Sequence, residues 1–158
     1  WLLCGIVWAQ PAWHDLRLSP VSVAFPQKPR LKVTQDSSPI GPVTSKNYEF
    51  QGDRYHLVLS STQLPSLAVT FRGADGLYED ASDALLKQYP QSQRVSFAPA
   101  SVAGRNGAEL NFTVNGQERG LARFVLLGEQ LLVAQAIWQN SASAKDALRF
   151  LNSLRLQP

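Results

Sequence analysis

Residues 108–138 form three successive segments, separated by two tight glycine turns, and the first segment alternates strictly between apolar and polar residues. The apolar positions of that first segment are Ala108, Leu110, Phe112 and Val114. A period of two residues is typical of a β-strand with one buried face. Asn115-Gly116 and Gly128-Glu129 favour two-residue hairpin turns, because asparagine and glycine tolerate positive φ. The stretch therefore predicts three consecutive antiparallel strands.

Two-residue turns also predict the register of these strands. The first turn would place Leu110 opposite Leu121, and the second would place Val125 opposite Leu132. One face of the sheet would then collect the following apolar side chains: Ala108, Leu110, Phe112, Val114, Leu121, Val125, Leu127, Leu132, Ala134, Ala136 and Trp138. The second and third segments are apolar at their other positions too, so both faces of the sheet require cover.

Two segments with helical spacing of apolar residues can supply that cover. Residues 75–89 end before Pro90, and residues 143–154 begin with a capping box formed by Ser143 and Asp146. Further strands are predicted at residues 21–25, 31–34, 43–50, 54–60 and 94–97, with a loop at 35–42 and irregular chain at 61–74. The sequence thus predicts an α+β fold, with a mostly antiparallel sheet of about six to eight strands and two main helices.

The N-terminal residues predict export. Residues 1–9 are apolar and uncharged, as in the end of a signal peptide, with cleavage expected after Ala9. Cys4 is the only cysteine, so the mature chain would contain no thiol. The apolar run is shorter than the roughly 20 residues that a transmembrane helix needs, so we expect no stable transmembrane segment in the mature chain. We expect residues 10–20 to form an N-terminal tether and residues 21–158 to form a single α+β domain.

Composition and motifs limit the chemistry that this chain can perform. The net charge of +3 is too small to indicate a nucleic-acid partner. His14 and His56 are the only histidines and have no metal-ligand spacing, and no nucleotide-binding or nucleophile motif occurs. The sequence therefore predicts no catalytic, metal or cofactor site.

Five short segments match a known family: residues 23–29, Gly41, 104–109, 119–124 and 150–156. Through them the chain resembles PsbP-like proteins, which include the extrinsic subunits of the photosynthetic oxygen-evolving complex and a fold-sharing Ran-binding family. It is more similar still to small secreted bacterial proteins of unknown function with that plan. The resemblance implies an α/β/α sandwich and an exported location. It carries over no catalytic residue, because the bacterial group has no established activity that belongs to a motif. It does not carry over the photosystem role either, because no metal-binding position of those subunits matches.

Basic residues provide the candidate contacts. Lys28, Arg30 and Lys32 alternate, so an extended chain would project them to one side. They form either a charged edge that discourages strand pairing or a contact for an anionic lipid, a polysaccharide or a partner. Arg119 and Arg123 lie on a largely apolar strand face, where a structural ion pair competes with an anion site.

Three functions remain open from the sequence. The first is an exported, non-enzymatic domain that binds a protein partner or assists a complex of the cell envelope. The second is a small-molecule or anion-binding module that uses Arg119 and Arg123. The third is a hydrolase that uses His56 as a general base, against which stands a histidine partly buried in a strand.

Overall fold

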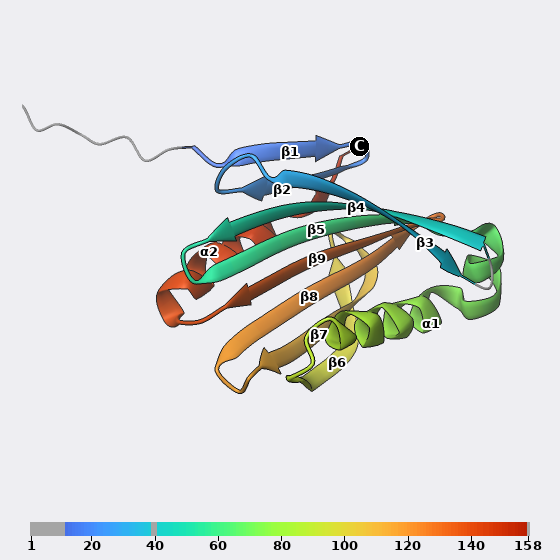
Figure 1. Ribbon diagram of the computed structural model, residues 1–158. Coiled ribbons are helices and arrows are strands. Elements are labelled where there is room, and N and C mark those ends of the chain that lie inside the picture. Colours follow the sequence, from blue (N-terminus) through green and yellow to red (C-terminus); the bar gives the residue numbers. More distant parts are fainter. Residues whose placement is uncertain (1–11, 39–40, 158) are drawn as a thin grey trace, which may run out of the picture.

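The structure is a computed structural model that describes residues 12–38 and 41–157 (Figure 1). The predicted signal peptide lies outside the described residues. The strands are β1 (His14–Leu18), β2 (Val21–Phe25), β3 (Arg30–Ser38), β4 (Gly41–Gly52), β5 (Tyr55–Gln63), β6 (Ser92–Val102), β7 (Arg105–Val114), β8 (Glu118–Leu127), β9 (Gln130–Trp138) and β10 (Arg155–Leu156), and the helices are α1 (Ser66–Lys87) and α2 (Ser141–Asn152).

A seven-stranded antiparallel sheet, with strand order β3-β4-β5-β9-β8-β7-β6, forms the middle layer. Helix α1 packs on one face over β6, β7 and β8, whereas α2 packs on the other over β5 and β9 (Figure 1). A small sheet of order β1-β2-β10 lies on the α2 side, where β2 contacts α2. The predicted α+β class, antiparallel sheet and two-helix sandwich are confirmed.

The seven-stranded sheet has a separate hydrophobic core on each face, one under α1 and one under α2, because β8 and β9 are apolar on both faces. The α2-side core contains Phe25 and Phe150, whose ring centroids are 4.8 Å apart, together with Val125 and Leu132. The α1-side core contains Leu110, Phe112 and Phe124 among others. Each buried side chain of this size contributes roughly 1.5–3 kcal/mol of hydrophobic stabilisation.

The predicted register of β7 against β8 is wrong by one residue. Val114 pairs with Glu118, so the turn contains three residues, Asn115–Gln117, rather than two. Leu110 consequently lies opposite Ala122, and it faces α1 while Val125 and Leu132 face α2. The predicted single apolar face is therefore split between two faces, and the fold tolerates this because both are covered.

Close packing at Gly120 explains the observed register. Phe112 lies opposite Gly120, and a Cβ atom added there would sit 2.2 Å from Phe112 Cζ. The ring therefore occupies the space that any other side chain at position 120 would need. In the predicted register Phe112 would face Arg119 instead. The register of β8 against β9 is as predicted, with Val125 opposite Leu132.

Several local predictions need correction. Within the predicted tether of residues 10–20, His14–Leu18 form β1, because Leu16 and Leu18 pack on the α2-side core. Pro20 and Pro26 bracket residues 21–25 and predict an edge strand, but β2 lies between β1 and β10. The predicted loop 35–42 is largely strand, since β3 and β4 extend into it. Strands β1 and β3 gain their order by hairpin pairing with the strands that follow them, and β2 also pairs with β10 from the far end of the chain.

Both helices begin earlier than predicted. Helix α1 starts at Ser66 and contains one non-helical residue, Gly73, at φ 66°. Helix α2 is capped by Asn140, whose side chain accepts from the Ser143 backbone N–H, rather than by Ser143 with Asp146. Among the described residues, neither helix combines the length and apolarity that a membrane crossing requires.

Candidate binding groove

The α1-facing side of the seven-stranded sheet changes from apolar to polar across the strand order. One row of laterally paired residues shows the change: Phe124 on β8, Val133 on β9, Ser60 on β5, Asn47 on β4 and Lys32 on β3. The next row on one side changes in the same way, from Leu126 and Leu131 on β8 and β9 to Thr62, Ser45 and Thr34 on β5, β4 and β3. Half of this sheet face therefore attracts the apolar side of α1, and the other half does not.

Because α1 covers the apolar half, a groove of about 490 Å³ remains between α1 and the polar half. Its floor is contributed by polar residues of β3, β4 and β5: Lys32, Thr34, Asp36, Ser45, Asn47, Glu49, His56, Ser60 and Thr62. Its α1 wall comprises Ala81, Ala84 and Leu85 and, just beyond the end of the helix, Gln88 and Tyr89. The rim residues Lys32, Asp36 and Gln88 are exposed.

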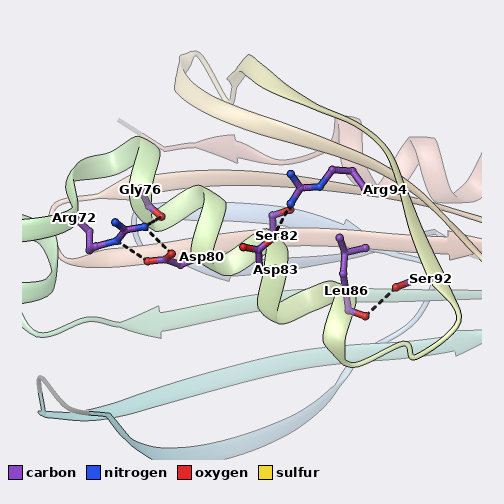
Figure 2. A network of polar contacts seen from close by, with 8 residues as sticks. All are labelled: Arg72, Gly76, Asp80, Ser82, Asp83, Leu86, Ser92 and Arg94. Carbon is purple, nitrogen blue, oxygen red and sulfur yellow. Dashed lines mark hydrogen bonds and ion pairs between the residues drawn. The ribbon is translucent and has the colours of Figure 1, made fainter.

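Polar contacts hold the second half of α1 in position as the groove wall. Figure 2 shows Arg94 of β6 reaching α1, where its Nη2 donates to Ser82 Oγ at 3.0 Å and pairs with Asp83 Oδ1 at 2.8 Å. The Ser92 hydroxyl donates to the Leu86 carbonyl at 2.9 Å. The helix is thereby tied to the β6 side of the sheet, away from the groove.

An ion pair between Arg72 and Asp80 bridges the break in α1. Arg72 donates from Nε and Nη2 to the two carboxylate oxygens of Asp80, at 2.9 and 2.8 Å, and from Nη2 to the Gly76 carbonyl (Figure 2). This bidentate geometry fixes the direction of the first two turns relative to the rest. Gly73 supplies the positive φ that the break requires.

Hydrogen bonds order the floor of the groove. Ser60 Oγ donates to Asn47 Oδ1 at 2.6 Å, and Ser45 Oγ lies 2.8 Å from Thr62 Oγ1. At the α1 side, Gln135 Nε2 donates to Tyr89 Oη at 2.8 Å. The floor is thus a fixed polar surface, whose remaining donors and acceptors can serve a bound molecule.

His56 lies where the groove meets two smaller hollows of about 250 and 310 Å³. Burial lowers the pKa of its imidazole, and nearby Glu49 opposes that shift. Among the residues that the structure describes, no side chain forms a hydrogen bond or ion pair with His56. A hydrolase would need a polar partner that orients this base, and Glu49 lines the same hollow without bonding to it, so the hydrolase stays a prediction.

The structure brings the three predicted basic contacts together at the rim of the groove. Lys28 and Arg30 line the hollow of about 310 Å³, together with Glu49 and His56. Lys32 lies two residues further along β3 and lines the main groove. All three cations are exposed, and they border an edge of the sheet, so both interpretations from the sequence remain compatible with their position.

Arg119 and Arg123 lie elsewhere, on the α2 face. Arg123 Nε pairs with Glu109 Oε2 at 3.0 Å, and its Nη1 donates to Asn152 Oδ1 at 2.8 Å. Arg119 is exposed on the same strand. Neither arginine lines the groove or the two hollows. The structural ion pair is therefore observed at Arg123, and the anion site at these residues stays a prediction.

The described residues contain no group of three or more histidine, cysteine, aspartate or glutamate side chains arranged to hold a metal ion. Two acidic residues of α1, Asp80 and Asp83, are engaged by arginines instead.

Comparison with known proteins identifies the fold. The solution structure of cyanobacterial PsbP (CyanoP) from Synechocystis sp. PCC 6803 superimposes with a TM-score of 0.62 at 12% identity, covering 97% of this chain and 96% of that one. The fold is PsbP-like. A protein of unknown function, PA94, from Pseudomonas aeruginosa matches with a TM-score of 0.43 at 14% identity, covering 89% of this chain and 96% of that one. No family model and no curated protein matches the sequence.

The groove itself was not predicted from the sequence, although one signal was present. His56, Val58, Ser60 and Thr62 alternate with the apolar Leu57 and Leu59. A mainly polar strand face opposite an apolar one normally faces solvent. Only the packing of α1 beside this face makes it the floor of a groove.

Proposed function

We propose that this chain is an exported, non-enzymatic domain that binds a protein partner of the cell envelope through the groove between α1 and β3–β5. The observation that carries the proposal is the partial cover of one sheet face. Helix α1 leaves its polar half exposed, yet the hydrogen-bonded pairs Ser60–Asn47 and Ser45–Thr62 keep that half ordered.

The character of the groove favours a polypeptide over a small molecule. Sites for small molecules are mostly apolar and bury most of the ligand. This groove has a polar floor and exposed rim residues of both signs, Lys32 and Asp36. Protein interfaces have polar rims of this kind around a smaller apolar centre, which Val58, Leu131 and Val133 supply here.

The export part of the proposal rests on the apolar first nine residues and on the PsbP-like fold. Expression of the native gene in its host, followed by mass spectrometry of the mature protein, tests it. We expect an N-terminus at Gln10 in the envelope or medium. A protein that retains residues 1–9 and stays in the cytoplasm would refute export.

Site-specific crosslinking tests the groove. A photoreactive benzoylphenylalanine replaces Ala84, which is exposed on α1 and lines the groove, or Ala142, which is exposed on α2 at the opposite face. We expect one discrete adduct in the native envelope from position 84 and none from position 142. Gln88→Trp, which narrows the groove, should reduce the adduct, whereas Lys145→Trp on α2 should not. Equal adducts from both positions would reject the groove as the binding site.

A further inference from the structure

Strand β3 forms one edge of the seven-stranded sheet and carries more basic than acidic side chains. We propose that it binds an acidic, extended segment of a partner polypeptide, which adds to the seven-stranded sheet as an eighth strand. This proposal rests on the proposed function, because it names the element by which the partner would bind beside the groove.

The direction of the β3 backbone groups follows from antiparallel pairing. The Arg54 carbonyl accepts from the Gln139 N–H, so even-numbered residues of β5 bond toward β9 and odd-numbered ones toward β4. Continued across β4, this alternation makes Arg30, Lys32 and Thr34 the residues that bond to β4. The N–H and C=O groups of Leu31, Val33 and Gln35 therefore point outward, where the described residues add no further strand.

The two edges of the sheet differ in how they are protected. Strand β6, at the other edge, has a register shift between Arg94 and Ser96 and contains Pro99, which has no N–H to donate. Bulges and prolines are devices that prevent a sheet edge from pairing. Strand β3 pairs in unbroken register with β4 and contains neither a bulge nor a proline. Its outward amides form a regular template.

The side chains of β3 select the chemistry of the added strand. Lys28, Arg30 and Lys32 provide three cations at this edge, against the single anion Asp36 within the strand. On the opposite face, Leu31 and Val33 are 51% and 52% exposed. A strand that alternates acidic and apolar residues would place its carboxylates beside Arg30 and Lys32. Its apolar side chains would lie beside Leu31 and Val33. A second copy of this chain would bring the same excess of positive charge.

Binding of a peptide by the purified protein tests the proposal. The probe is a nine-residue peptide of alternating valine and glutamate, and its matched control has lysine in place of each glutamate. Titration into ¹⁵N-labelled protein should shift the amides of Leu31, Val33 and Gln35 and slow their hydrogen exchange. The lysine peptide should bind at least about tenfold more weakly.

Two variants separate the backbone from the charge. Val33→Pro removes an outward N–H without breaking a bond to β4, so it should weaken binding at least about tenfold while the melting temperature stays close to that of the wild type. Arg30→Glu combined with Lys32→Glu keeps the backbone and should reverse the preference between the two peptides. Lys145→Glu on α2 is the control and should change neither.

Other outcomes would overturn the proposal. Equal affinity for both peptides would refute the role of charge. Amide chemical-shift changes confined to the floor of the groove would refute the added strand. A concentration-dependent dimer without peptide, abolished by Val33→Pro, would show that a second copy occupies the edge. If the peptide fails while crosslinking from Ala84 persists, the edge is rejected and the groove stands. If crosslinking fails while the peptide binds, the proposed groove is rejected instead.

Discussion

The side chain of Tyr78 joins α1 to two strands through one oxygen atom. Gly107 pairs with Val125 at the end of the β7–β8 ladder, so the next pair would be Asn106 and Leu126. The Tyr78 hydroxyl is inserted there: it accepts from the Leu126 N–H at 2.8 Å and donates to the Asn106 carbonyl at 3.2 Å. Burial raises the pKa of Tyr78, so the hydroxyl remains protonated and able to donate at neutral pH.

Replacing Tyr78 with phenylalanine should therefore cost more than a typical loss of one hydroxyl. The side chain is 3% exposed, so water cannot easily replace either bond. Two lost hydrogen bonds, and a backbone N–H left without a partner, correspond to about 2–3 kcal/mol in the free energy of unfolding. For a domain of this size the melting temperature should fall by about 4–12 °C.

Urea unfolding followed by tryptophan fluorescence measures this loss, with an unchanged m-value as the sign that only stability has altered. Tyr48→Phe is the matched control, because no described side chain or backbone group bonds to the hydroxyl of Tyr48. It should change stability by less than about 0.5 kcal/mol. Amide hydrogen exchange should also accelerate at Leu126 in the Tyr78 variant. Equal stability of the two variants, or unaltered exchange at Leu126, would refute the bridging role.

Three further predictions concern stability. Arg123→Ala should destabilise the fold by about 1–2 kcal/mol more than Arg119→Ala, because only Arg123 pairs with Glu109 in a half-buried position; equal melting temperatures would contradict this. Burial lowers the pKa of His56 below its usual 6.5, so the unfolded chain binds the proton first as the pH falls. The free energy of unfolding should thus be highest above pH 6.5 and should decline below it. In urea titrations His56→Gln should flatten this pH dependence, and an unchanged pH profile would refute the buried position of His56. Asn140→Ala removes the α2 cap and should cost about 1 kcal/mol in thermal unfolding, whereas no loss would argue against the cap.

The fold class was predictable because periodicity and turn residues are local properties. The strict alternation of Ala108 to Val114 and the turn at Gly128-Glu129 needed no knowledge of the rest of the chain. The strand at His14–Leu18 was missed because its order depends on pairing with β2. The start of α1 was missed because residues 66–74 include Gly73, which interrupts the helical pattern.

The candidate groove was less predictable. The alternation of Lys28, Arg30 and Lys32 indicated a basic edge, and the structure places that edge at the rim of the groove. The predicted register, with Leu110 opposite Leu121, would place Arg123 opposite Ala108, but the one-residue change in register places Glu109 opposite Arg123. A small error in turn length therefore exchanged an apolar neighbour for a carboxylate.

The sequence alone determined that strands with alternating or doubly apolar faces would pair antiparallel and need two amphipathic helices, because side-chain periodicity follows directly from the order of residues. Tertiary structure decided which strands became edges, which faces the helices cover, and where polar positions on β3, β4 and β5 meet. The physical reason is that lateral neighbours such as Lys32, Asn47 and Ser60 are far apart in the chain, so only the completed sheet and the placement of α1 make them one surface.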